Sequence, residues 1–425
     1  MSVPLWSVVL ASIATVFIFG LVLVIFARSE KEITQRVGHL YSITDPQFLR
    51  SMNGLLGPTL VSGNRIETLL NGDEIFPAML KAIRAAEKTL AFETFIYWSG
   101  NIGQEFVDTL SEKARQEVRI HVLLDWFGSL KMDESWVRKM RDAGVEVEKY
   151  HPFKWHNWRK LNNRTHRKIL VVDGKIAFTG GVGIADEWNG HAQGPDHWRD
   201  THYRLEGPVV AQLQGAFIDN WIEARGDVLH GEEYFPQLKE VGPYLAQVFK
   251  SSREGGANST HLMYLLAIAA AKKSIHLSMA YFIPDELARE AMVAALTRGV
   301  TIQIILPGRY IDKTLVRSAS RGTWGPLLEA GAEIFEFQPT MFHCKVLIVD
   351  ELWVSVGSTN LDNRSFKLND ESNLNVYNEQ FAEHQLTDFK ADLARARQIT
   401  LQEWENRPWK EKSREYALEK IQSQL

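Results

Sequence analysis

Two copies of the pattern His-x-Lys-x-x-x-x-Asp hold the side chains of this chain that are best suited to catalysis. Their six named residues are His166, Lys168, Asp173, His343, Lys345 and Asp350. On a strand, residues two apart face the same way, so each His projects together with its Lys. Each Asp lies seven residues beyond its His, and this odd offset turns it to the opposite face. We therefore expect the His-Lys pairs to react and the aspartates to anchor their strands through buried hydrogen bonds or ion pairs.

Two imidazoles and two ammonium groups at one point are suited to phosphodiester transfer. One imidazole can attack phosphorus as a nucleophile while the other protonates the departing oxygen. The lysines supply positive charge to the non-bridging oxygens. Such chemistry needs no metal and no other cofactor, and the sequence offers no carboxylate cluster beside the motifs to hold one.

A turn of small residues follows each motif, at 179–183 and at 356–360. In the second turn, Ser358 and Asn360 offer side-chain donors, and we expect both to bind the substrate phosphate. The first turn reads Thr-Gly-Gly-Val-Gly and offers only backbone groups.

A nucleophilic imidazole also needs an acceptor at Nδ1, so that Nε2 is free to attack. Asp200 stands just before a strand-like segment in the first half of the chain, and Glu371 stands at the matching place in the second half. We expect each carboxylate to orient the histidine of its own half, Asp200 for His166 and Glu371 for His343.

The two motifs close two halves of an internal repeat. In each half an alanine-rich helical stretch leads into a strand, and further helix and strand patterns follow in the same order. The matched strands are 86–97 with 271–282, 118–124 with 300–306, and 145–150 with 332–337. This alternation predicts an α/β protein with two pseudo-symmetric halves, at 60–235 and 236–395, each with a mixed sheet and helices outside. We expect two sheets, with the motifs meeting at the midline.

Composition narrows the class of protein. The 425 residues are 45% hydrophobic and 24% charged, with a net charge of −4 and a pI of about 6.4. A dedicated nucleic-acid binder usually has a basic excess, so we expect no nucleic-acid partner. The single cysteine, Cys344, excludes an intrachain disulfide and suits a reducing compartment.

The N-terminus predicts a membrane anchor. Residues 3–27 carry no charge, and roughly 20 helical residues suffice to cross a bilayer. Basic residues follow this segment, so the positive-inside rule places the remaining chain in the cytoplasm. The alternative is a buried core helix. We expect a linker at 28–59 and a charged helical tail at 396–425, solvated or, as a second interpretation, lying on the membrane surface.

These residues resemble the phospholipase D superfamily, and in particular its bacterial cardiolipin synthase-like branch. The resemblance rests on 92–97 and on the first motif with its Gly180-Gly181 turn. It continues with Trp198-Arg199-Asp200-Thr201 and 205–221, and in the second half with the motif, its turn and 363–371. It extends over most of 60–395. Gly183 is a departure, because the family often has Asn at this position.

The resemblance implies a covalent phosphohistidine mechanism, with His166 as nucleophile and His343 as general acid and then base. It implies transfer of a phosphatidyl group between phospholipids, with phosphatidylglycerol as acceptor and cardiolipin as product. With the anchor, it implies a single-pass protein of the bacterial inner membrane with a cytoplasmic catalytic body. The alternatives are a hydrolytic phospholipase D, a metal-independent nuclease of the same superfamily, and a non-catalytic membrane scaffold.

Overall fold

The computed structural model describes residues 4–25, 33–153, 162–252 and 258–419. The strands of the first half are β1 (Val61–Leu70), β2 (Thr89–Thr94), β3 (Arg119–Asp125), β4 (Glu146–Tyr150), β5 (Arg164–Thr165), β6 (Ile169–Val172), β7 (Ile176–Gly180) and β8 (Thr201–Glu206). Those of the second half are β9 (Tyr244–Ser251), β10 (Ser274–Met279), β11 (Phe282–Ile283), β12 (Thr301–Pro307), β13 (Glu333–Phe337), β14 (Lys345–Val349), β15 (Trp353–Gly357), β16 (Leu361–Asp362), β17 (Asn369–Tyr377) and β18 (Ala396–Ile399).

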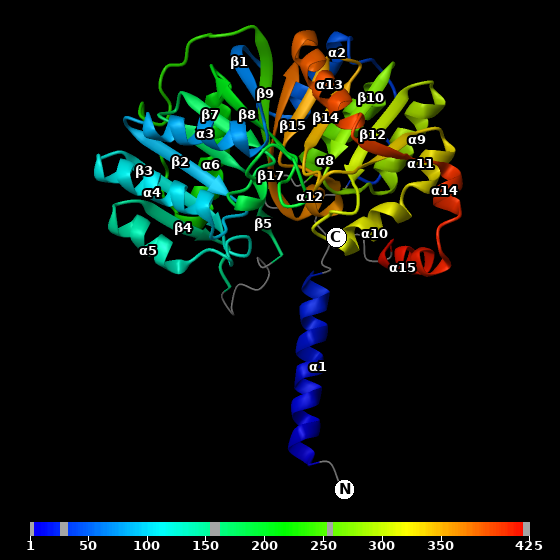
Figure 1. Ribbon diagram of the computed structural model, residues 1–425, viewed down its shortest axis with the longest axis horizontal. Helices are drawn as coiled ribbons and strands as arrows, with labels where there is room; N and C mark the ends of the chain where they lie inside the picture. Colours follow the sequence, from blue (N-terminus) through cyan, green and yellow to red (C-terminus); the bar gives the residue numbers. More distant parts are fainter. Residues whose placement is uncertain (1–3, 26–32, 154–161, 253–257, 420–425) are drawn as a thin grey trace.

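Helices surround these strands, as Figure 1 shows. Before and within the first half they are α1 (Leu5–Ile25), α2 (Pro46–Leu56), α3 (Asn71–Arg84), α4 (Asn101–Arg115), α5 (Glu134–Asp142), the short 3₁₀ helix η2 (Asp186–Trp188) and α6 (Val210–Arg225). Within and after the second half they are α8 (Asn258–Ala270), α9 (Glu286–Thr297), α10 (Thr314–Gly322), α11 (Gly325–Glu329), α12 (Asn363–Lys367), α13 (Glu379–Leu393), α14 (Leu401–Glu405) and α15 (Trp409–Glu419).

The predicted repeat is present, but its two halves share one sheet. The strand order is β18-β13-β12-β10-β14-β15-β17-β9-β1-β8-β7-β6-β2-β3-β4. The halves join where β1 and β9 pair antiparallel. The expectation of two separate sheets is therefore wrong. An inner edge strand in each half would expose unpaired backbone groups, and pairing the two edges satisfies both.

Each half has three parallel strands on its outer side and antiparallel strands toward the midline, and in the second half β18 adds an antiparallel strand at the outer edge. Strands β2, β3 and β4 run parallel, as do β10, β12 and β13. The motif strands β6 and β14 run antiparallel to β2 and β10. The residues just before β6 and β14 therefore lie at the edge where the parallel strands end, the usual place for a site in an α/β sheet.

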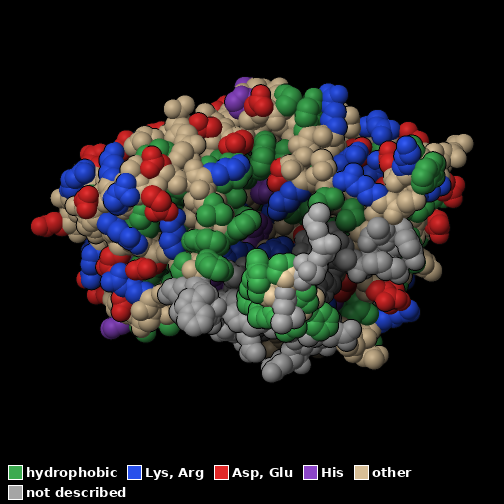
Figure 2. Space-filling model, turned by 90° about the horizontal axis from the view of Figure 1, so that it is seen from below, with side chains coloured by type: hydrophobic (Ala, Val, Ile, Leu, Met, Phe, Trp, Pro, Cys, Tyr) green, Lys and Arg blue, Asp and Glu red, His purple; other side chains and the backbone are tan. Residues whose placement is uncertain are grey.

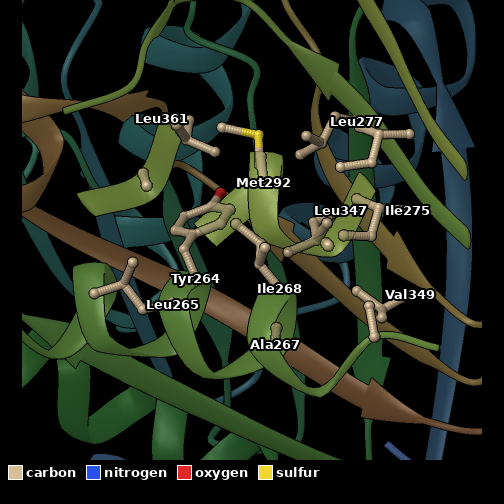
Figure 3. Close-up of a cluster of buried hydrophobic side chains, with 14 of the residues drawn as sticks. Tyr264, Leu265, Ala267, Ile268, Ile275, Leu277, Met292, Leu347, Val349 and Leu361 are labelled. Atoms are coloured by element: carbon tan, nitrogen blue, oxygen red, sulfur yellow. The ribbon is translucent and has the colours of Figure 1, made fainter. Parts of the chain in front are cut away.

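Apolar packing of helices on this sheet forms the core. Figure 3 shows one part of it in the second half, where Tyr264 and Ile268 of α8 and Met292 of α9 meet Leu277 of β10 and Leu347 of β14. The strands are buried on both faces, which explains their nearly continuous runs of β-branched and leucine side chains.

Two segments that the sequence placed outside the body belong to it. The expected linker contains α2, whose Phe48 and Met52 are buried in the core of the second half. The expected tail contributes β18, which pairs with β13, and α15, which packs on α10. The sequence placed both segments outside the body because they read as polar and charged. The contacts that attach them to the body form only in the folded protein.

Helix α1 extends away from the body at the face where β5 and α10 lie (Figure 1). Within the described residues, no helix combines the length and the apolar character that a membrane crossing requires. Residue 3 and residues 26–27 of the predicted anchor lie outside the described part of the chain.

Candidate active site

Both His-Lys pairs lie at the midline, because each motif is attached to the opposite half. The backbone N–H of His166 donates to the carbonyl of Asp370 at 2.8 Å, and that of His343 donates to the carbonyl of Arg199 at 2.7 Å. Strand β5, directly before His166, pairs parallel with β17. Phe342, directly before His343, forms a bridge with Arg199. The two motifs thus meet at one point, as the repeat predicted.

The orienting carboxylates are exchanged between the halves. Nδ1 of His166 lies 3.0 Å and 3.1 Å from the two carboxylate oxygens of Glu371. Nδ1 of His343 lies 2.7 Å from Oδ2 of Asp200. The predicted pairing within each half is therefore wrong, although both carboxylates are at the site. The reason is the crossed backbone pairing, which sets each histidine beside the residue that precedes the other half's carboxylate.

The two lysines are buried beside the histidines. Nζ of Lys168 donates to the carbonyl of His166 at 2.7 Å, and Nζ of Lys345 donates to that of His343 at 2.6 Å. Burial lowers the pKa of both lysines. Burial, then the charges of Lys168 and Lys345, also hold the pKa of His166 well below its usual range. Lysines of both halves therefore act on the same imidazole, as a composite site requires.

Three hydrogen-bond donors surround the carboxylate of Asp200. It accepts from Nδ1 of His343, from Nε1 of Trp188 at 2.9 Å and from the backbone N–H of Thr201 at 2.8 Å. Burial would raise the pKa of Asp200, but His343, Lys345 and the Trp188 hydrogen bond outweigh it and hold that pKa below its usual value. The pKa of His343 itself is lowered to about 4, chiefly by burial and by Lys345, while Asp200 opposes this shift.

At Glu371, burial outweighs the hydrogen bonds and the nearby charge in setting the pKa of the carboxylate. It accepts from Ser358 Oγ at 2.5 Å, from Ser365 Oγ at 2.8 Å and more weakly from Asn369 at 3.4 Å. Burial nevertheless raises the pKa of Glu371 to about 7, because the opposing Lys168 charge and these hydrogen bonds do not fully compensate. Ser365 lies in the first turn of α12, which Asp362 caps, and no local sequence pattern indicated its contact with Glu371.

The two expected phosphate donors have different surroundings. Ser358 is fully buried, and its hydroxyl is occupied by Glu371 and by the carbonyl of Ser372. In this structure Ser358 supports Glu371, and a phosphate contact for it stays a prediction. The backbone N–H of Asn360 donates to Ser365 Oγ, and Oδ1 of Asn360 has no hydrogen-bond partner in the described structure. A phosphate contact for Asn360 stays a prediction.

The motif aspartates lie at the other end of their strands and anchor them. Asp173 accepts from the backbone N–H groups of residues 87–89, and Asp350 accepts from those of residues 272–274. Both adopt positive φ, at 51° and 52°. Each thus fastens the turn after its motif strand to the start of β2 or β10, which is the role that strand parity indicated.

Aromatic rings that the sequence did not single out enclose the imidazoles. The centre of the Phe95 ring lies 5.3 Å from the centre of the His166 ring. The rings of Trp188, Trp198 and Tyr281 lie 5.3, 5.6 and 6.3 Å from that of His343. Sequence signals existed for Phe95 and Trp198, since both stand in the quoted motif segments.

Gly183 is packed too closely against its neighbours to carry a side chain. A Cβ here would lie 2.7 Å from Cβ of Ile96 and 3.3 Å from the ring of Trp188. Ile96 and Trp188, which donates to Asp200, thus leave no space for an Asn side chain at this position. In the described part of the chain, no group of three or more His, Cys, Asp or Glu side chains is arranged to hold a metal ion.

A sheet with two such crossed His-Lys-carboxylate sets defines a phospholipase D-type enzyme. The family model described as "Cardiolipin synthase, PLD-like domain" matches residues 79–190 and 264–393. The chain is 36% identical over 378 residues to cardiolipin synthase A of Pseudomonas fluorescens Pf-5, across 88% of this chain and 77% of the relative. It is 33% identical to a cardiolipin synthase of Alkalihalophilus pseudofirmus, across 90% and 75%. The chain belongs to the cardiolipin synthase family, whose enzymes are phosphatidyltransferases of phospholipase D type.

Solved structures agree with this fold. A phosphatidylserine synthase of Haemophilus influenzae superposes with a TM-score of 0.68 at 14% identity, over 89% of this chain and all of that one. A polyphosphate kinase of Porphyromonas gingivalis gives 0.55 at 11% identity, over 93% of this chain and 57% of that one. At these identities the likeness concerns the fold alone.

Proposed function

We propose that the chain forms cardiolipin by moving a phosphatidyl group from one phospholipid, through a phosphohistidine on His166, to a hydroxyl of phosphatidylglycerol. The observation that carries this proposal is the pair of buried imidazoles, each bonded at Nδ1 to a carboxylate, with Nζ of Lys345 only 3.2 Å from Nε2 of His343. The cardiolipin synthases to which the chain is similar support the choice of product.

The unequal carboxylates support the assignment of roles. A nucleophile must be neutral, and the pKa of His166 lies well below its usual range. A general acid must carry a proton. The pKa of His343 is also lowered, to about 4, but Asp200 opposes that shift, whereas the pKa of His166 lies well below its usual range, so His343 is the imidazole that holds a proton more readily. His166 is therefore the nucleophile and His343 the acid and base.

The reaction then has two balanced steps. Nε2 of His166 attacks phosphorus, the bond from phosphorus to the leaving glycerol oxygen breaks, and His343 gives that oxygen its proton. In the second step His343 takes the proton from the acceptor hydroxyl, whose oxygen attacks phosphorus and releases His166. Lys168, Lys345 and Asn360 stabilise charge on the non-bridging oxygens.

The test uses the full chain with phosphatidylglycerol vesicles and a metal chelator, with products identified by mass spectrometry. Cardiolipin and glycerol are expected. Phosphatidic acid alone would identify a hydrolase, and unchanged lipid would refute the proposal. With lipid carrying a radioactive phosphate, wild-type protein should retain acid-labile label and the His166→Ala variant should retain none. The matched control is His384→Ala, since His384 is 60% exposed and remote from the reaction.

We also propose that residues 3–27 attach the enzyme to the bacterial inner membrane with its body in the cytoplasm. The uncharged sequence supports this, as do the exposed apolar side chains of α1, such as Ile13 and Phe17. The full chain should stay with membranes after a carbonate wash. A Val16→Glu, Phe17→Lys variant should be released, and its retention would count against the anchor.

A further inference from the structure

Two loops extend from the sheet edge that carries the site. One follows β3 and the other follows β12, and both strands end at the same edge as their parallel neighbours. In the first loop, Gly128 packs so closely on Phe95 that a Cβ would lie 2.0 Å from the carbonyl oxygen of Phe95. In the second, both carboxylate oxygens of Asp312 lie 2.8 Å from the hydroxyl of Tyr281. Phe95 and Tyr281 contact the two catalytic imidazoles, so these loops form the mouth of the site.

Large apolar side chains stand exposed around this mouth. Phe127 and Leu130 in the first loop are 59% and 58% exposed, and Phe153 beside Trp126 is 59% exposed. Leu315, directly after the second loop, is 51% exposed. Leaving aside α1, eight large apolar side chains among the described residues are more than half exposed, and these four belong to segments that follow β3, β4 and β12 at this edge of the sheet. Figure 2 looks onto this face and shows hydrophobic side chains beside a hollow in which histidine is visible, with α1 pointing toward the viewer.

Basic side chains alternate with the apolar ones. Nζ of Lys131 lies 3.7 Å from the centre of the Trp98 ring, and Cζ of Arg309 lies 4.5 Å from the centre of the Tyr310 ring. Both are exposed, as is Lys313, while Asp312 is the acidic neighbour in the second loop. Aromatic and basic residues together are typical of surfaces that rest at the boundary between lipid headgroups and acyl chains.

Helix α1 leaves the body on this same side (Figure 1). The apolar helix, the apolar mouth and the reacting groups therefore share one face. An exposed apolar patch of this kind marks a site of interaction. Because the apolar helix α1 points the same way as the patch, its direction indicates that the patch contacts a lipid bilayer.

We propose that Phe127, Leu130, Phe153 and Leu315 form an interfacial rim that inserts into the surface of an anionic phospholipid bilayer. The inference rests on the proposed lipid substrate and adds how the enzyme meets it. The rim seats the mouth on the membrane, so that headgroups reach His166 and His343 while the acyl chains stay in the bilayer. The basic residues Lys131, Arg309 and Lys313 face the anionic headgroups.

Insertion can be measured without catalysis. Leu130→Cys receives an environment-sensitive fluorophore, which the native Cys344 should not, because it is only 1% exposed. The matched control is Leu55→Cys, since Leu55 is 57% exposed and lies on α2, on the opposite side of the body from α1 (Figure 1). Both full-length proteins are placed in phosphatidylglycerol vesicles that contain lipid with a nitroxide on its acyl chain, so both are tethered alike.

Quenching at position 130 at least about twofold stronger than at position 55 is expected from insertion to the depth of the upper acyl chains. Equal quenching at the two positions would overturn the rim. Because this readout needs no turnover, it separates failure of the rim from failure of the proposed function.

A kinetic test uses Phe127→Ser, Leu130→Ser, with Leu55→Ser as its control. Loss of two inserted apolar side chains should raise the apparent KM for vesicle phosphatidylglycerol about tenfold. The rate on a monomeric short-chain phosphatidylglycerol should stay unchanged, because no surface has to be engaged. An equal loss on both substrates would show damage to the site rather than loss of docking, and unchanged KM would refute the proposal.

Discussion

The two histidines of the site are held by matching positions that use different residues. Gly180 pairs with His202 in the first half and Gly357 pairs with Asn373 in the second, so Gly181 with Asp200 corresponds to Ser358 with Glu371. In the first half the short carboxylate approaches the glycine so closely that a Cβ on Gly181 would lie 2.1 Å from Oδ1 of Asp200. In the second half the longer carboxylate leaves space, and the serine hydroxyl fills it with a hydrogen bond.

The two pairs, Gly181 with Asp200 and Ser358 with Glu371, give the same contact to a histidine Nδ1 but different pKa values of the carboxylate. Both carboxylates reach an Nδ1, but the pKa of Asp200 is low and that of Glu371 is raised to about 7. A duplicated site can thus assign unlike roles to identical histidines through the residues behind them.

Glu371→Gln should have the largest effect. An amide cannot act as the anionic acceptor for Nδ1–H of His166, and in the wrong orientation its N–H₂ fixes the unproductive tautomer. We expect kcat to fall by about 10³–10⁴-fold, measured on phosphatidylglycerol vesicles, with an unchanged circular dichroism spectrum. A loss below tenfold would mean that Glu371 does not orient the nucleophile.

Gly181→Ser imposes the second-half residue on the first half. The new Cβ collides with Asp200, so the carboxylate must move away from His343. We expect about a 100-fold lower kcat from this misplacement. Gly194→Ser is the control, because a Cβ at Gly194 meets nothing within 4 Å. If both variants are equally active, the close approach of Asp200 to the turn has no catalytic importance.

Asp350→Asn should affect stability rather than catalysis. The amide keeps one acceptor oxygen but cannot accept all three backbone N–H groups of residues 272–274. The free energy of unfolding should fall by about 1–3 kcal/mol in urea denaturation, while kcat of the folded enzyme is retained. Asp196→Asn, in an exposed loop, should change neither quantity. A large loss of kcat in Asp350→Asn would place the motif aspartate in the chemistry.

Ser358→Ala should have the smallest effect, visible in the pH profile. The Ser358 hydrogen bond lowers the pKa of Glu371, so its loss raises a pKa that is already about 7. Glu371 is ionised above this pKa, and activity is lost as pH falls through it. The acid limb of kcat/KM should therefore move to higher pH by about 0.7, equivalent to one hydrogen bond of ~1 kcal/mol. A shift to lower pH, or none, would contradict the assigned contact.

Much of the fold followed from the sequence because the repeat is carried by local patterns. The strands near 89–94 and 274–279, the motif strands and the helices between them are strongly periodic, and all of them form. The joined sheet, the burial of α2 and the packing of α15 did not follow, since each depends on a partner distant in sequence. The same holds for the contact of Ser365 with Glu371 and for that of Trp188 with Asp200, since both join residues that only the fold brings together.

The sequence by itself determined the chemistry and its duplication. Residue types and strand parity separated the His-Lys pairs from the anchoring aspartates, because side-chain direction along a strand is a local property. Only the tertiary structure decided which carboxylate serves which histidine and that Ser358 supports Glu371. Those facts arise from backbone pairing across the midline, between 166 and 370 and between 343 and 199, which no local pattern encodes.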